Sequence, residues 1–370
     1  MKVKMVHKIM GQTLPKTRIS NFEILRLVAM FIIITHHFVV HGIYPVVQIS
    51  SVHTVNAAAA VLIGWGGYLG NSIFVILTGY FSIIQKISYR RLFFLVLTMI
   101  FYSVAIASLC KLQGRPVGEV KQILFPFWYG YNWFISCYLV LMLFVPFLNI
   151  TLLNLNKPAY LAFLLLFFVC YNVIPEKGGA TFMSNAPFLQ FLLMYSIGGY
   201  IRLHGFSRYA LNNTRFWVVV SAILIIILDT FLIRHWAMGQ DIFKYVNIFS
   251  TGIAVSFFMI AKTSRNLYIP WINTIAGTVL GVYLIHDNPI VRPIIWRMVF
   301  PNIFILESNS FLLLAFVKII CVFVGCIAID LIRQRILERP LKKLLYSPIS
   351  IVSIHIKKWM EKTWIAFNRI

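Results

Sequence analysis

Continuous apolar segments of membrane-spanning length recur along the chain. Clear examples are Val61–Ile84, Leu92–Leu109 and Phe216–Ile233. A helix needs roughly 20 residues to cross the ~30 Å hydrocarbon core of a bilayer. The apolar residues are continuous or follow the helical period, without the alternation of a barrel strand. Backbone polar groups in lipid must bond within their own segment, so these runs predict transmembrane helices.

About ten such spans follow from the pattern, and they predict an all-α, polytopic membrane helix bundle. Hydrophobic residues make up 60% of the 370 residues and charged residues only 12%, which is too little polar surface for a soluble protein of this length. The expected spans are 22–41, 61–84, 92–110, 133–151, 158–173, 187–203, 216–233, 245–261, 273–290 and 311–332.

The basic residues predict the orientation of the bundle. If both termini are cytoplasmic, the cytoplasmic segments hold roughly three times as many Lys and Arg residues as the outer loops. The net charge of +23 lies at the ends of apolar runs and not on one soluble face, so a nucleic-acid partner is not expected. We therefore expect a membrane domain over residues 1–332 and a basic, amphipathic cytoplasmic tail over 333–370 that lies on anionic lipid.

The first expected span carries a stripe of ionisable residues. The eleven residues from Arg26 to His37 amount to three helical turns plus roughly 20°, about 16 Å along the axis. Glu23 and His41 lie three and four residues beyond this pair and join the same face, whereas His36 is turned away. Ionisable groups in a membrane usually face a bundle interior or a wet cavity. The alternative is a headgroup-level Glu23–Arg26 ion pair and a structural His37.

Several motifs occur along the chain in the same order as in acyltransferase family 3, which the sequence resembles. The members of this family are bacterial membrane acyltransferases that modify surface glycans. Arg26 and His37, with ten residues between them, are similar to the family's Arg-x10-His signature, although Leu27 replaces a glycine found in other subgroups. In the motif Phe74–Phe81, Thr78 stands where serine is more usual in the family. The remaining motifs are Asn21–Arg26, Phe74–Phe81, Tyr89–Leu92, Trp133–Asn149, Gly281–Pro289 and Glu338–Pro340.

The resemblance implies transfer of an acyl group, commonly acetyl, from cytoplasmic acyl-CoA to a hydroxyl of a cell-surface or exported glycan, or of a lipid-linked sugar, in the bacterial cell membrane. Arg26 is expected to hold a phosphate or the thioester carbonyl. His37 is expected to act as general base or as a transient acyl carrier. Glu23 orients or neutralises Arg26. If the helix is shifted, His36 takes the catalytic role.

Other candidate residues each have a functional and a structural interpretation. Two arginines at the start of the third span either bind the CoA phosphates or set topology. The remaining candidates either bind the acceptor or serve as interfacial anchors and helix caps. For one of them, His41, the two interpretations are a proton relay and a structural role. These residues are Arg90 and Arg91 for the donor, and His286, Asp287, Trp133, Tyr138 and His41 for the acceptor.

Two other classes of function are compatible with a basic, polytopic chain. A polysaccharide flippase or polymerase, or another transporter, would often show internal repeats and matched broken helices, and no matched pair is evident. A bis-histidine haem or metal protein would use the i, i+4 spacing of His37 and His41, but the sequence offers no second matched pair. Five cysteines without CxxC spacing also do not indicate zinc, so no metal is expected.

Overall fold

The structure, a computed structural model, is built from helices. It describes residues 18–45, 55–85, 87–172, 187–205, 247–302 and 305–338, together with residues 220 and 340. This part of the chain contains no strand, which confirms the all-helical fold. The ten spans and the cytoplasmic termini stay predictions. Within the described residues, five helical segments are long and apolar enough to cross a membrane: Ser20–Ile43, Val55–Ser82, Tyr89–Leu112, Trp133–Asn154 and Phe311–Glu338.

The helices begin and end close to the expected spans. The expected span 216–233 lies outside the described residues, apart from residue 220. The last helix continues past residue 332, where we expect the membrane domain to end. The elements are α2 Ser20–His37, η1 Phe38–Ile43, α4 Val55–Gly64, α5 Gly67–Ser82, α6 Tyr89–Leu112, α7 Val120–Leu124, α8 Trp133–Asn154, α9 Lys157–Asn172, α10 Pro187–His204, α13 Asn247–Thr263, α14 Pro270–Ala276, α15 Val279–His286, α16 Val291–Pro293, η3 Ile294–Val299, α17 Phe311–Arg333 and η5 Gln334–Glu338.

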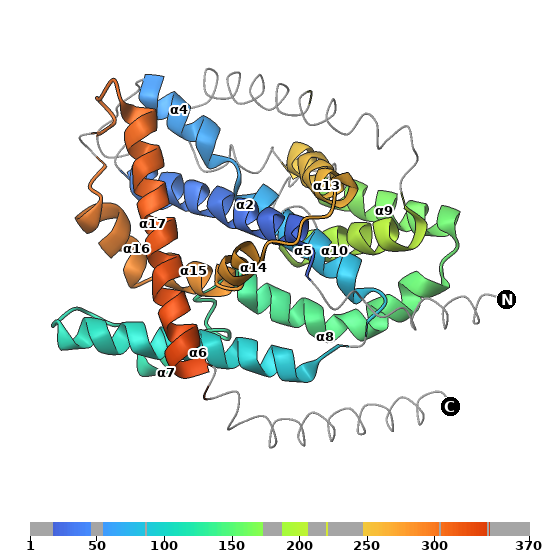
Figure 1. The fold of residues 1–370 in the computed structure, drawn as a ribbon, viewed down its shortest axis with the longest axis horizontal. Helices are drawn as coiled ribbons and strands as arrows, with labels where there is room; N and C mark the ends of the chain where they lie inside the picture. Colours follow the sequence, from blue (N-terminus) through green and yellow to red (C-terminus); the bar gives the residue numbers. More distant parts are fainter. Residues whose placement is uncertain are drawn as a thin grey trace, which may run out of the picture.

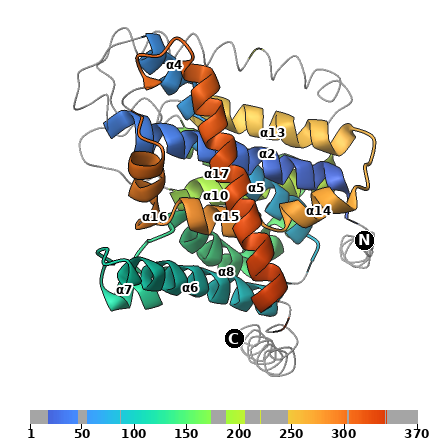
Figure 2. The same cartoon turned by 60° about the vertical axis from the view of Figure 1, so that its left-hand side comes forward.

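Helix α2 lies at the centre of the bundle, with α13 alongside it and α17 crossing it obliquely (Figures 1 and 2). It also packs on α5, α14 and α15. Its apolar face, which includes Ala29, Ile33 and Ile34, is almost fully buried. At Phe38 the helix changes to the π-helix η1, where an α-helix was expected to continue to residue 41. Such π-helical turns occur frequently at functional sites.

The N-terminal end of α2 is fixed by the Asn21 amide. Its Nδ2 donates to the carbonyl oxygens of Ala261 and Arg265, at 3.2 and 3.0 Å, and its Oδ1 accepts from the Leu267 N–H at 2.8 Å. One side chain thereby satisfies three backbone groups near the end of α13. Arg26, which follows five residues later, is therefore held at a defined place in the bundle.

Helices α5 and α10 approach each other closely through two glycines. A Cβ atom on Gly79 would overlap the carbonyl oxygen of Tyr195, and one on Gly198 would overlap that of Ile76. Small residues let membrane helices bring their backbones together, which increases the packing contacts that hold such helices in lipid.

Two of the expected spans are interrupted. Span 61–84 consists of α4 and α5 with a turn at Trp65 and Gly66, and span 273–290 consists of α14 and α15 with a break at Gly277 and Thr278. The sequence pattern predicts neither interruption, although Val55–Ser82 as a whole is long and apolar enough to cross a membrane. The Gln334 side chain donates to the Gly277 carbonyl at 3.0 Å and so satisfies a group that the break leaves exposed. Non-helical backbone at membrane depth is tolerated where it is buried in protein or lines a cavity.

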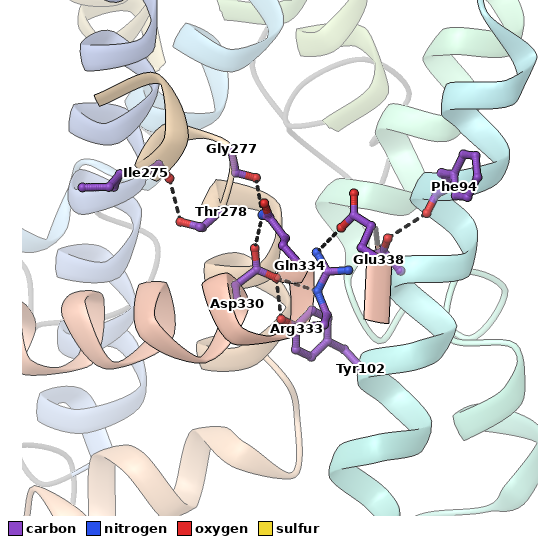
Figure 3. Close-up of polar contacts among 10 residues, drawn as sticks. Phe94, Tyr102, Ile275, Gly277, Thr278, Asp330, Arg333, Gln334 and Glu338 are labelled. Carbon is purple, nitrogen blue, oxygen red and sulfur yellow. Dashed lines mark hydrogen bonds and ion pairs between the residues drawn. The ribbon is translucent and has the colours of Figure 1, made fainter. Parts of the chain in front are cut away.

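A buried polar cluster joins α17 to α6 and to the α14–α15 break (Figure 3). Its centre is the Asp330 carboxylate, which has no exposed surface. Oδ1 accepts from the Tyr102 hydroxyl at 2.5 Å and from Arg333 Nε at 2.7 Å, and Oδ2 accepts from Gln334 Nε2 at 2.6 Å. Arg333 Nη2 also pairs with Glu338 at 2.7 Å. A buried charge is tolerated when it is paired and hydrogen-bonded in this way, so the cluster fixes the position of the break.

Candidate functional site

A cavity of about 280 Å³ lies beside Arg26, and we call it the Arg26 cavity. Its walls come from α2, α5, α6, α8 and the α14–α15 break, and they are mostly apolar. The polar side chains in its lining are Arg26, Thr78, Tyr138 and Tyr283, and Gly277 of the break also lines it. A concave, mainly apolar site with a few converging polar groups is the usual form of a small-molecule site.

Arg26 forms an ion pair with Glu23, through Nη1 and Oε1. The Glu23 side chain is buried, whereas 31% of the Arg26 side chain is exposed. A guanidinium carries five N–H donors, so donors remain for an anion or a carbonyl group in the cavity. The pairing predicted from the i, i+3 spacing is therefore present, and it leaves Arg26 able to bind a ligand.

A second cavity, of about 250 Å³, lies beside His37, and we call it the His37 cavity. It is more polar than the first. His36 and His37 line it from α2, Asn71 from α5 and Trp133 from α8. Gly67, which follows the α4–α5 turn, also lines it, so each of the two helix breaks borders one cavity.

The hydrogen bonds of His286 define the tautomer of His37. His286 Nδ1 lies 2.6 Å from the Val282 carbonyl oxygen, so this nitrogen is the donor. Its Nε2 is then an acceptor in the neutral ring, and it lies 2.9 Å from His37 Nδ1, which therefore donates. The remaining nitrogen, His37 Nε2, carries the lone pair. The network assigns to His37 the form that can take a proton in the cavity it lines.

Asp287 brings a buried negative charge to His37 and His41. Only 1% of its side chain is exposed. Its Oδ1 lies 3.4 Å from His37 Nδ1 and 3.7 Å from His41 Nε2, and it accepts a hydrogen bond from Arg292 Nε at 2.8 Å. A carboxylate this close to an imidazole stabilises the imidazolium that forms when the ring accepts a proton.

His37, His41 and Asp287 also have a spacing that would suit a metal ion. One ligand atom from each residue lies within 4.8 Å of the others. However, His37 Nδ1 is bonded to His286, and Asp287 Oδ1 is bonded to Arg292, whose positive charge opposes a cation at this point. That no metal takes part stays a prediction.

The structure brings some of the other candidate residues together and separates others. Trp133 lines the His37 cavity, whereas Tyr138, named with it as an acceptor candidate, lines the Arg26 cavity. Arg90 and Arg91 lie in the first turn of α6 and do not line the Arg26 cavity. His36 lines the His37 cavity, and its Nδ1 contacts the Gly64 carbonyl oxygen.

Four residues at the site were not predicted to be site residues, although Tyr283 and Phe134 lie within the motifs Gly281–Pro289 and Trp133–Asn149. Tyr283 also lies three residues before His286, on the same face of a helix. Arg292 lies five residues after Asp287. Asn71 is a lone amide in an apolar helix. Phe134 gives no signal of its own, because one more aromatic residue in a membrane helix is unremarkable until its neighbours are placed.

Comparison with known proteins identifies the family. The family model described as an acyltransferase domain, of the acyltransferase 3 type, matches residues 19–331. Comparisons with curated proteins and with solved structures gave no significant match. The matched region includes both cavities and every residue of the His37–His286–Asp287 cluster. Together with the apolar helices, the match supports a membrane acyltransferase. The chain belongs to acyltransferase family 3.

Proposed function

We propose that this protein transfers an acyl group, with acetyl as the expected group, from acyl-CoA to a hydroxyl of a cell-surface or exported glycan or of a lipid-linked sugar. The observation that carries this proposal is the arrangement of two cavities along one helix. One contains Arg26, and the other contains a histidine prepared to accept a proton.

The Arg26 cavity is the proposed donor site. Its apolar walls suit the pantetheine arm and the acyl group, and Arg26 suits a phosphate or the thioester carbonyl. Arg90 and Arg91 remain candidates for the CoA phosphates, outside the cavity at the start of α6. With the N-terminus in the cytoplasm, Arg26 lies toward the compartment that supplies acyl-CoA.

The His37 cavity is the proposed acceptor site. Trp133 offers an aromatic face for a sugar ring, and Asn71 offers an amide for its hydroxyls. His37 Nε2 takes the proton of the reacting hydroxyl as its oxygen attacks the thioester carbonyl carbon. The new C–O bond forms, the C–S bond breaks, and the CoA thiolate takes up a proton. His286 holds the His37 tautomer, and Asp287 stabilises the imidazolium.

We further propose that the enzyme lies in the bacterial cell membrane with both termini in the cytoplasm. The excess of basic residues in the expected cytoplasmic segments supports this orientation. The basic tail, 333–370, would then lie on anionic lipid headgroups.

The proposal is tested with the purified protein in proteoliposomes, given labelled acetyl-CoA and a glycan fraction from the cells that make the protein. Wild type should label the glycan, and His37→Ala and Arg26→Ala should not. His36→Ala is the matched control and should retain transfer. Undiminished transfer by a folded His37→Ala protein would contradict the mechanism, and loss with His36→Ala alone would move the assignment to His36. Glycan that crosses the membrane without acyl-CoA would favour a transporter.

A further inference from the structure

The two cavities share part of their walls. Ile33 of α2, Phe134 of α8 and Tyr283 of α15 line both the Arg26 cavity and the His37 cavity. All three side chains are buried, with 2%, 8% and 3% of their surface exposed. The rings of Phe134 and Tyr283 lie with their centroids 5.7 Å apart. We call these three residues the partition.

The partition lies between the two functional residues of α2. Ile33 follows Arg26 by seven residues and precedes His37 by four, so all three share a face of the helix. Tyr283 is next to the catalytic histidine, with its ring centroid 6.5 Å from that of His37. A straight path from one cavity to the other therefore passes these three side chains.

The Phe134 ring packs against two further aromatic rings, from α10 and α5. Its centroid lies 5.2 Å from that of Phe191 on α10 and 6.2 Å from that of Phe74 on α5, in edge-to-face contacts. Such contacts stabilise the packing of aromatic rings beyond the effect of burying their surface. The ring is thus a packed part of the wall and not a side chain that projects into open space.

We propose that the partition is a barrier that keeps water in the His37 cavity away from the thioester in the Arg26 cavity. This inference rests on the proposed function. A histidine that activates a sugar hydroxyl activates water equally well, and water would then take the acyl group as the carboxylic acid and release the CoA thiol. While the barrier is closed it limits this loss, and transfer requires that the acyl carbonyl pass it to meet the bound acceptor hydroxyl.

The first experiment measures access between the cavities and does not depend on catalysis. Thr78 lines the Arg26 cavity but not the His37 cavity. A membrane-impermeant thiol reagent is added to proteoliposomes of Thr78→Cys from the Arg26 side or from the His37 side, and the adduct at position 78 is identified by mass spectrometry. We expect modification from the Arg26 side only. Adding Phe134→Ala should raise modification from the His37 side at least tenfold.

Two further variants keep this test decisive. Phe144→Ala removes the same side chain from the same helix at a position that is 51% exposed and lines neither cavity, so it should not change access. Phe134→Leu keeps an apolar side chain and should give an intermediate effect if Phe134→Ala folds poorly. Modification from the His37 side without any change in the partition, or equal modification with Phe134→Ala and Phe144→Ala, would overturn the barrier.

The second experiment measures the effect of the barrier on hydrolysis of acyl-CoA. In the absence of acceptor, Phe134→Ala should hydrolyse acetyl-CoA at least several-fold faster than wild type, and its ratio of transfer to hydrolysis should fall. Phe144→Ala should keep the wild-type ratio. An unchanged ratio in Phe134→Ala would contradict the inference. If wild type consumes no acyl-CoA at all, the proposed function fails, while the access experiment still decides whether the barrier exists.

Discussion

At the scale of single residues, His36 and His37 are neighbours in the sequence with different surroundings. His36 is bound to a backbone carbonyl at the α4–α5 turn, whereas His37 is bound to a second imidazole and lies near a buried carboxylate. Only the second arrangement combines a defined tautomer with a charge that stabilises the protonated ring. This difference is the reason for assigning the chemistry to His37, and it makes His286 a positioning residue.

We predict that His286→Ala lowers kcat by about ten- to a hundredfold, because His37 Nδ1 loses its acceptor and the ring is no longer held in one tautomer. KM for acyl-CoA should not change, since the Arg26 cavity is untouched. His286→Gln, whose amide oxygen can accept the same hydrogen bond, should recover part of the rate. Steady-state kinetics of the three proteins measure this. Equal kcat in wild type and His286→Ala would contradict a positioning role.

Arg292 is the charge that balances Asp287. Removing one partner of a buried ion pair costs about 3–5 kcal/mol, because the other charge stays buried without compensation. We therefore expect Arg292→Ala to lower the thermal midpoint of the detergent-solubilised protein. Arg297→Ala, an exposed arginine in the neighbouring η3, is the matched control and should not. A midpoint shift that is the same for both variants would show that the Arg292–Asp287 pair does not stabilise the fold.

A chelator distinguishes proton-transfer chemistry from metal chemistry at the cluster. We expect prolonged incubation with EDTA, followed by gel filtration, to leave acetyl transfer unchanged, because the positive charge of Arg292, which is hydrogen-bonded to Asp287, opposes a cation at the cluster. Metal analysis of the treated protein is the accompanying control. Loss of transfer that is restored by one added divalent cation would establish a metal site made by His37, His41 and Asp287.

At the scale of elements, the long continuous helices were predictable and the interruptions were not. Spans 92–110 and 133–151 correspond to α6 and α8, because a continuous apolar run is itself the signal for a membrane helix. The break at Gly277 is harder to predict from the sequence. The group that satisfies its carbonyl is the side chain of Gln334, 57 residues away, so no local pattern marks the break. Hydropathy averages over such a break.

Some residues of the candidate site were likewise predictable from the sequence, and others were not. Arg26, Glu23 and His41 were found by helical spacing, which operates within one element, and His286 and Asp287 through the resemblance to the family. The partition and the Arg292–Asp287 pair were not found. Their members come from α2, α8, α15 and α16, and only tertiary packing brings these side chains together.

The packing of α15 on α17 depends on Gly281. A Cβ atom at this position would overlap the Asp330 carboxylate, so Gly281→Ala should displace Asp330 from Tyr102 and Arg333. Overpacking of this kind costs roughly 1–3 kcal/mol. We expect a lower thermal midpoint than for Gly325→Ala, the matched control in α17, where an added Cβ meets nothing within 4 Å. Equal midpoints for the two variants would show that the clash is relieved without loss.

At the scale of the whole molecule, α2 borders both cavities. Arg26 lies in its first half, beside the proposed donor cavity, and His37 lies at its end, beside the proposed acceptor cavity. The partition separates them by the thickness of a few side chains. The proposed orientation and function together predict that the acyl group crosses the membrane as it is transferred and that CoA stays on the side where it binds.

The most direct measurement of this arrangement uses proteoliposomes in which the protein has one orientation. Labelled acetyl-CoA is supplied only on the Arg26 side and the glycan acceptor only on the His37 side, and labelled glycan is measured over time. We predict transfer in this configuration and none when the two substrates are exchanged. Transfer that occurs only when both substrates are on the same side would contradict a site reached from both sides of the membrane.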